Sequence, residues 1–269
     1  MKQPRRIVSG FTLVELLVVI GIIALLIGIL IPTLSKAQQQ AKVTACLSNL
    51  KQLTQGWIMY ANDNRGSMPF AETGDGADPS NVDKRDGWVI DKPGDPDTNT
   101  RASIEKGLLW KYVPGAEAYR CPASYDTANF RSYSISTHMN GTPTIFYPNF
   151  YTSGYPPNNA PPPIITKISK AKPNRLVFIE EFDERGFNQG SFLQFKGLNS
   201  FIWGDIPAFF HRKGTTMSFA DGHAEYRVWN DPRTVNARRA QPQVNPNNMD
   251  LQKLKIDIYG DPDRPASSY

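Results

Sequence analysis

The chain has few of the residues with which enzymes usually build catalytic or metal sites. Its 269 residues include two cysteines and three histidines. The metalloprotease pattern H-E-x-x-H is absent, as are the serine-hydrolase pattern G-x-S-x-G and the phosphate-binding pattern G-x-x-x-x-G-K-[ST]. The adjacent carboxylates Glu180 and Glu181 would point to opposite faces of a strand and would form no acid–base pair. We therefore expect no enzyme, no catalytic residue, no metal ligand and no bound cofactor.

Neither sign of charge dominates the chain beyond its first residues. The formal net charge of +5 comes from 30 basic and 25 acidic residues, and residues 1–10 carry three of the basic ones and none of the acidic ones. Without these ten residues the net charge falls to +2, and the basic side chains are scattered. A nucleic-acid-binding surface needs a concentrated basic patch. The composition therefore argues against nucleic acid as a partner.

Charge is almost absent between residues 11 and 34, where a long apolar run contains one charged residue, Glu15. A helix of about 20 residues rises about 30 Å, which matches the hydrocarbon thickness of a bilayer. A lone carboxylate inside such a run is costly unless a cation neutralises it. The first basic residue downstream is Lys36. Cleavage between Gly10 and Phe11 would create an α-amino group that could supply the missing cation.

Residues 10–15, GFTLVE, follow a short basic leader and resemble the class III signal of type IV pilins and type II secretion pseudopilins. The resemblance implies that a prepilin peptidase cleaves after Gly10 and N-methylates Phe11. It also implies that Glu15 pairs subunits in the core of a filament, and Pro32 stands where many members have a helix-kinking proline. A conventional secretory signal has an apolar core of about 7–15 residues and a small-residue cleavage site, which this segment lacks. An ordinary single-pass anchor fits the length but gives Glu15 no purpose.

The basic leader also predicts where the chain lies. A positively charged N-terminus stays in the cytoplasm, so the bulk of the chain is expected outside it, in the periplasm or in a surface filament. The chain then divides into a leader at 1–10, a transmembrane and filament-core helix at 11–34, an amphipathic continuation of that helix at 35–66, and a β-rich head at 67–269. The expected partners are the prepilin peptidase, other pilin or pseudopilin subunits, the secretion or pilus assembly machinery, and the inner membrane that the chain spans once.

The predicted fold class is α+β, with a long N-terminal helix packed on an antiparallel sheet. Apolar side chains recur at steps of three and four between residues 34 and 60, which predicts a helix that ends near residue 66. Other predicted elements are strands at 132–136, 175–182 and 192–195, a short helix at 103–113 that Ser103 would cap, and a helical or strand piece at 251–258.

Residues 215–228 give the clearest hairpin pattern, with two alternating runs on either side of Asp221-Gly222. This dipeptide between alternating runs is a strong signal for a two-residue turn. The turn would set a register that divides the side chains between two faces. The apolar face would hold Thr215, Met217, Phe219, Ala224, Tyr226 and Val228, and the polar face would hold Thr216, Ser218, Glu225 and Arg227.

The same hairpin carries an H-x9-D-G pattern formed by His211, Asp221 and Gly222, with His223 directly after it. The pattern is similar to the mark of the prepilin-type H-X9-DG proteins. A six-residue strand is about 20 Å long, so His211 and Asp221 would lie at opposite ends of the strand. We therefore expect these residues to be structural, with Asp221 accepting hydrogen bonds at the turn. The alternative is a metal-dependent hydrolase site near His211 and His223.

The two cysteines lie in segments 45–52 and 120–122, which also resemble the H-X9-DG group. Outside the cytoplasm, Cys46 and Cys121 favour a single disulfide. It would close a loop of about 75 residues and stabilise the head by roughly 4 kcal/mol. The alternative is a buried free thiol at each position.

Two loops give further hypotheses. Residues 71–101 contain aspartates whose oxygens could collect a calcium ion in the head, namely Asp75, Asp78, Asp83, Asp86 and Asp91. Their spacing does not fit an EF-hand, and a solvated acidic loop is the alternative. Residues 141–163 are rich in proline and aromatic residues, which could bind a glycan or a protein or could cover the head's own apolar surface. A membrane-tethered or filament-borne binding module is therefore the alternative to a filament subunit.

Overall fold

The computed structural model of the chain describes residues 12–73, 87–90, 100–126, 130–141, 164–182, 190–192, 194, 203–237 and 245–260. The chain divides into two compact units, residues 1–41 and residues 42–269. The first unit contains the apolar part of helix α1. The second unit, called the head unit below, contains the rest of that helix and all of the strands.

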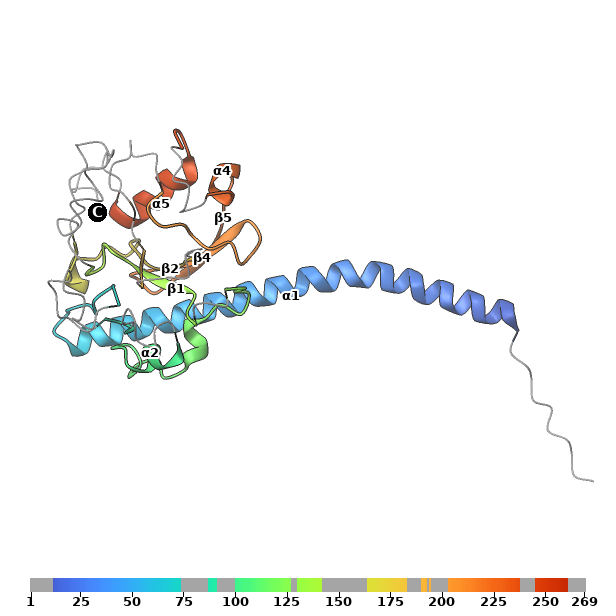
Figure 1. Ribbon diagram of the computed structural model, residues 1–269, viewed down its shortest axis with the longest axis horizontal. Coiled ribbons are helices and arrows are strands. Elements are labelled where there is room, and N and C mark those ends of the chain that lie inside the picture. Colours follow the sequence, from blue (N-terminus) through green and yellow to red (C-terminus); the bar gives the residue numbers. More distant parts are fainter. Residues whose placement is uncertain are drawn as a thin grey trace, which may run out of the picture. The chain divides into compact units, whose positions relative to one another are not determined.

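Helix α1 runs from Leu13 to Asp63 (Figure 1), so the helix predicted from the apolar run and its amphipathic continuation is confirmed. Pro32 lies inside the helix and does not end it. By length and composition this helix can cross a membrane. Its large apolar side chains are exposed from Leu13 to Leu34, whereas from Val43 onward one face is buried in the head unit.

A five-stranded sheet in the order β3-β1-β2-β4-β5 forms the centre of the head unit. Its strands are β1 (Tyr133–Ser136), β2 (Leu176–Glu180), β3 (Ser191–Phe192), β4 (Gly214–Phe219) and β5 (Ala224–Val228). The α+β class is confirmed, but the sheet is mixed, because β3 pairs with β1 in parallel while the other pairings are antiparallel. The chain reverses direction at β2 and again at β3, and β3 then lies beside β1, so these two strands run the same way.

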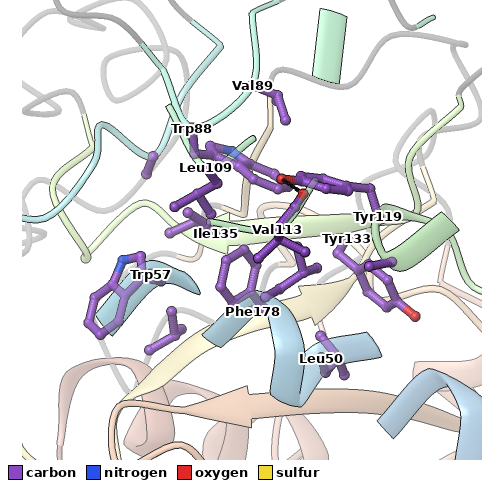
Figure 2. Close-up of a cluster of buried hydrophobic side chains, with 14 of the residues drawn as sticks. Leu50, Trp57, Trp88, Val89, Leu109, Val113, Tyr119, Tyr133, Ile135 and Phe178 are labelled. Carbon is purple, nitrogen blue, oxygen red and sulfur yellow. Dashed lines mark hydrogen bonds between the residues drawn. The ribbon is translucent and has the colours of Figure 1, made fainter. Parts of the chain in front are cut away.

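Helices cover both faces of the sheet (Figure 1). One face packs against the buried part of α1, whose hydrophobic cluster also includes Ile104 of α2 (Arg101–Glu105), and the other packs against α5 (Met249–Tyr259). The remaining elements are the 3₁₀ turns η1 (Ala116–Tyr119) and η3 (Ile168–Lys170) and the short helix α4 (Pro232–Val235). Figure 2 shows the core on the α1 side, where Leu50 and Trp57 of the helix pack with Phe178 of β2.

One of the predicted short elements differs from the structure, and another is confirmed. Helix α2 begins at Arg101 with Thr100 at its N-cap, so Ser103 does not cap it, and the helix ends at Glu105. The hydroxyl of Ser103 instead donates to the carbonyl oxygen of Thr100 at 2.7 Å. The piece expected near residues 251–258 is helix α5, which begins after Asn248, whose side chain accepts a hydrogen bond from Leu251 N at 3.0 Å.

The β4–β5 hairpin is confirmed, but its predicted register is wrong by one residue. The loop has three residues, 220–222, because Phe219 N donates to His223 O at 3.0 Å. Gly222 ends the loop with a φ of +91°, which is typical of a three-residue hairpin loop and costs glycine little. Met217 therefore lies opposite Glu225, and Ser218 lies opposite Ala224.

The shift leaves the predicted faces of β4 unchanged but exchanges the faces of β5, so that Glu225 shares a face with Met217 and Ala224 shares a face with Ser218. Met217 and Phe219 pack on the α5 side, where Met217 neighbours Ile179 of β2. Ser218 faces α1, and Thr54 Oγ1 of the helix donates to its hydroxyl oxygen at 2.7 Å. The face of β4 predicted to be polar is thus buried under the helix, where Ser218 is hydrogen-bonded to Thr54, whereas among the described residues the hydroxyl of Thr216 has no hydrogen-bond partner.

Gly107 lies where any side chain would meet the backbone of the segment that carries Trp88. A Cβ atom there would be 2.2 Å from the carbonyl oxygen of Trp88 and 2.6 Å from Cα of Val89. We predict that Gly107→Ala lowers the free energy of unfolding of the head unit by about 2 kcal/mol. Urea denaturation followed by tryptophan fluorescence measures this, because all five tryptophans lie after residue 41.

The matched control for this substitution is Gly115→Ala. Gly115 has a φ of −110°, and a Cβ atom there would approach no atom more closely than Glu117 Oε2 at 4.0 Å. We expect the control to change the unfolding free energy by less than about 0.5 kcal/mol. If the two variants are equally stable, Gly107 does not lie as close to the backbone of Trp88 and Val89 as the structure shows.

Lys255 on α5 is 1% exposed, and this burial lowers the pKa of its amine to about 7 from 10.5. The unfolded chain therefore binds more protons than the folded chain between pH 7 and pH 10.5, and the stability of the head unit rises with pH across that window. We predict that Lys255→Met stabilises the head unit more at pH 6 than at pH 10, by about 4 kcal/mol. Urea denaturation of both proteins at the two pH values tests this, and a pH-independent difference would contradict the lowered pKa.

Candidate functional site

At the start of α1, Glu15 is hydrogen-bonded to its own helix. Thr12 donates to Glu15 Oε2 through its backbone N at 2.9 Å and through Oγ1 at 2.7 Å, and Glu15 N donates to Thr12 Oγ1 at 3.3 Å. This reciprocal pattern is a capping box, formed by an N-cap threonine and a glutamate three residues later. The T-x-x-E pattern of a capping box is present in the sequence, whereas the prediction from the sequence gives Glu15 only a cation as its partner. Gly10 and Phe11 lie outside the described residues, so cleavage and methylation there stay predictions.

A second site lies inside the head unit, where four side chains of metal-ligating type meet. One ligand atom from each of them lies within 4.8 Å of the others, and all four side chains are buried. They come from α1, from the segment after η1, from the end of β2 and from the residues before β4, and they are Cys46, Cys121, Glu180 and His211. Of these four residues, the sequence makes only His211 a candidate metal ligand, in the alternative of a hydrolase site with His223, and it predicts no role for Glu180.

Two contacts within this four-residue cluster join three of its members. His211 Nε2 lies 3.1 Å from Glu180 Oε1 and 3.2 Å from Cys121 Sγ. The other oxygen of Glu180, Oε2, accepts a hydrogen bond from Thr216 N at 2.7 Å, and Cys121 Sγ accepts one from Ala123 N at 3.3 Å. The carboxylate is thus held from the β4 side with its second oxygen turned toward the histidine.

The helix and its neighbouring segment position the two sulfur atoms. Cys46 lies four residues before Leu50, so both side chains share the buried face of α1. Asn49 of the same helix donates through Nδ2 to the carbonyl oxygens of Glu117 at 3.3 Å and Arg120 at 3.0 Å. These bonds fasten the segment that leads into Cys121 to the helix that carries Cys46.

The sheet and the hairpin position the other two ligand groups. Glu180 lies two residues after Phe178 on β2, and both side chains face α1. The carbonyl oxygen of His211 accepts a hydrogen bond from the hydroxyl of Tyr226 at 2.8 Å. Gly214 makes this contact possible, since a Cβ atom at that position would lie 2.3 Å from the ring of Tyr226.

The groups in the cluster shift one another's ionisation. A hydrogen bond with Cys121 lowers the pKa of Cys46 to about 7, and the same contact raises the pKa of Cys121. Burial opposes a charge on His211, but hydrogen bonds with Cys46 and Glu180 outweigh it and raise the pKa of this histidine to about 9. Burial, reinforced by the neighbouring thiolate, raises the pKa of Tyr133. Between pH 7 and pH 9 the metal-free cluster therefore favours a thiolate beside an imidazolium.

The predicted disulfide between Cys46 and Cys121 is not formed in the structure, where both residues are free thiols. Their sulfur atoms are close, but they share the cluster with a histidine and a carboxylate instead of bonding to each other. The alternative given for the cysteines, a buried free thiol at each position, is the arrangement observed. The two cysteines do lie together, as a disulfide requires, but their sulfur atoms are not bonded to each other.

The H-x9-D-G residues are divided between the two ends of β4. His211 belongs to the buried cluster, whereas Asp221 and Gly222 form the hairpin loop at the other end. Asp221 Oδ1 accepts a hydrogen bond from His223 N at 3.0 Å and contacts the ring nitrogen Nδ1 of the same residue. A hydrolase site that uses His211 and His223 together is therefore wrong. The acidic residues proposed for calcium and residues 142–163 of the proline-rich loop lie outside the described residues.

Comparison with known proteins concerns the N-terminal part of the chain. Residues 5–31 match the family described as the Prokaryotic N-terminal methylation motif. The chain is 37% identical over 62 residues to the Type II secretion system core protein G of Pseudomonas aeruginosa. The aligned segment covers 23% of this chain and 44% of that protein. The chain is 45% identical over 56 residues to the Type IV wide pilus major component PilA4 of Thermus thermophilus. The aligned segment covers 21% of this chain and 43% of that protein. The chain thus spans less than half the length of these relatives, and no solved structure matches it.

Proposed function

Because the chain carries the N-terminal methylation motif and resembles a type II secretion pseudopilin and a type IV pilin over its N-terminal part, we propose that it is a filament subunit processed by a prepilin peptidase. The peptidase would cleave after Gly10 and methylate the new amine of Phe11. The mature helix would then assemble with other subunits into a type II secretion or type IV pilus-like filament. The role proposed is structural, without catalysis.

The observation that carries this proposal is the exposure of α1 between Leu13 and Leu34. Every large apolar side chain in this stretch is at least 45% exposed in the single chain. A helix that is apolar all round needs lipid or other apolar helices around it. The apolar helix and the relatives together indicate a membrane-anchored protein. We propose that the membrane covers the helix before assembly and that neighbouring subunits cover it in the filament, with the head unit outside the cytoplasm.

The capping box explains how Glu15 can serve both its own helix and a neighbouring subunit. Both bonds from Thr12 go to Oε2 of the carboxylate. In the part of the chain that the structure describes, Oε1 is left to accept a bond from another molecule. The amide bond between Phe11 and Thr12 survives cleavage, so the cap persists in the mature chain. The methylated amine of a neighbouring Phe11 is the cation that we propose for Oε1, because a charge-assisted bond in an apolar surrounding is strong.

Substitutions at the capping box separate the charge of Glu15 from its role in the cap. Glu15→Gln keeps an oxygen that can accept from Thr12 but removes the charge. We predict that this variant is processed normally and that its filament yield falls at least about tenfold, as expected if each subunit contact loses ~1.4 kcal/mol or more. Filament yield is measured in sheared and membrane fractions, and intact mass confirms processing in both.

The matched control is Thr12→Val, which removes the hydroxyl of the cap and keeps the carboxylate. Its yield should stay within about twofold of the unmodified chain, since loss of a cap costs roughly 1 kcal/mol of local helix stability. Normal filaments from Glu15→Gln would contradict the charge pairing. A tethered binding module is not favoured by any described residue, because residues 142–163, on which it depends, lie outside them.

A further inference from the structure

The four-residue cluster of the head unit has the number and kinds of ligand atoms that zinc takes in structural sites. It offers two sulfurs, one imidazole nitrogen and one carboxylate oxygen, all buried. Structural zinc sites are four-coordinate and draw on these ligand types. Calcium and magnesium prefer sites made of oxygen alone, so the two sulfurs argue against both ions.

Two distances in the cluster are slightly shorter than the separations between ligand atoms in a tetrahedral zinc site. The edge of a tetrahedron is about 1.6 times the distance from centre to corner, so zinc bonds of about 2.0–2.3 Å separate ligand atoms by about 3.3–3.8 Å. His211 Nε2 is 3.1 Å from Glu180 Oε1 and 3.2 Å from Cys121 Sγ. No two ligand atoms of the cluster are more than 4.8 Å apart. An ion therefore fits after His211 Nε2 moves a few tenths of an ångström from these two neighbours and any wider pair of ligand atoms closes on the ion.

Hydrogen bonds around the cluster orient the ligand groups toward its centre. Glu180 uses Oε2 to accept from Thr216 N, which leaves Oε1 beside the imidazole. The backbone N–H of Ala123 donates to Cys121 Sγ, a bond that favours the thiolate form that metals bind. Supporting bonds of this kind fix the ligands of metal sites and tune their affinity.

Neither metal-free arrangement accounts for all four side chains. A disulfide between Cys46 and Cys121 would carry no charge, so it would not stabilise the buried ionisable groups of His211 and Glu180 beside it. A buried ion pair between His211 and Glu180 would explain those two residues but not why both thiols lie against them. A metal ion uses all four groups and neutralises the charges that burial makes costly.

We propose that the four-residue cluster is a structural zinc site. The ion would join α1 to the segment after η1, to β2 and to the start of the β4–β5 hairpin, which are far apart in the sequence. It would take the place of the predicted disulfide as the cross-link of the head unit. Four protein ligands leave no open coordination position, so the site stabilises the fold and does not hold a reacting water.

A matched pair of histidine variants tests the proposal in the full-length chain, purified in detergent under reducing conditions without chelator. Elemental analysis should find about one zinc per chain. His211→Gln should retain at least about tenfold less zinc in competition with a chelator. His223→Gln should retain as much zinc as the unmodified chain, because His223 is exposed and bonded to Asp221. Zinc retained equally by both variants would overturn the assignment of His211.

A measurement on the unmodified chain avoids the chance that His211→Gln fails to fold. X-ray absorption at the zinc edge should show two sulfurs at about 2.3 Å and two nitrogen or oxygen atoms at about 2.0–2.1 Å. Chelation should lower the thermal midpoint followed by tryptophan fluorescence, and added zinc should restore it. A zinc-free chain overturns the proposal, whether its intact mass shows two free thiols or the loss of two hydrogens to a disulfide.

Discussion

The head unit depends on the contact between the buried face of α1 and the sheet. Leu50, Leu53 and Trp57 are fully buried there, against Phe178 of β2 among others (Figure 2). Burial of apolar surface contributes about 25 cal/mol for each Å² removed from water. The end of α1 is therefore part of the head unit's core. A head cut free of this helix would expose the face on which the four-residue cluster is built.

One continuous helix thus meets two different demands. Its first part is apolar on every side and is exposed in the single chain from Leu13 to Leu34. Its later part is apolar on one side, and that side is already covered within the head unit. Only the first part still needs a partner, which lipid or neighbouring helices can provide. The similarity to curated relatives also lies at this end of the chain, which carries the exposed apolar side chains.

Much of the fold could be predicted from the sequence because its patterns are local. The long helix, the strands β1 and β2 and the existence of the hairpin all follow from periodicity and turn residues. The register of the hairpin did not, because Asp221-Gly222 fits a two-residue turn and also the end of a three-residue loop. That single residue of difference decides that Glu225 and Arg227 share a face with Met217 and not with Ser218. The capping box could also have been predicted, because Thr12 and Glu15 form the T-x-x-E pattern, but it was not.

The four-residue cluster could not be predicted, because its members lie far apart in the sequence and only the packing of α1 on the sheet brings them together. One signal did exist. Glu180 ends an apolar strand pattern, and a carboxylate at a buried position needs a partner. The two cysteine segments and the H-x9-D-G pattern were each noted for their resemblance to one group of proteins, and each supplies a member of the cluster.

The central claim is that this chain is a processed filament subunit, and its N-terminus tests that claim most directly. Intact mass and N-terminal sequencing of protein recovered from native membranes would identify the first residue and its modification. The account predicts a mature chain that begins at Phe11 with a methylated amine. A chain that still begins at Met1 would contradict it and would leave a head unit anchored by an uncleaved helix.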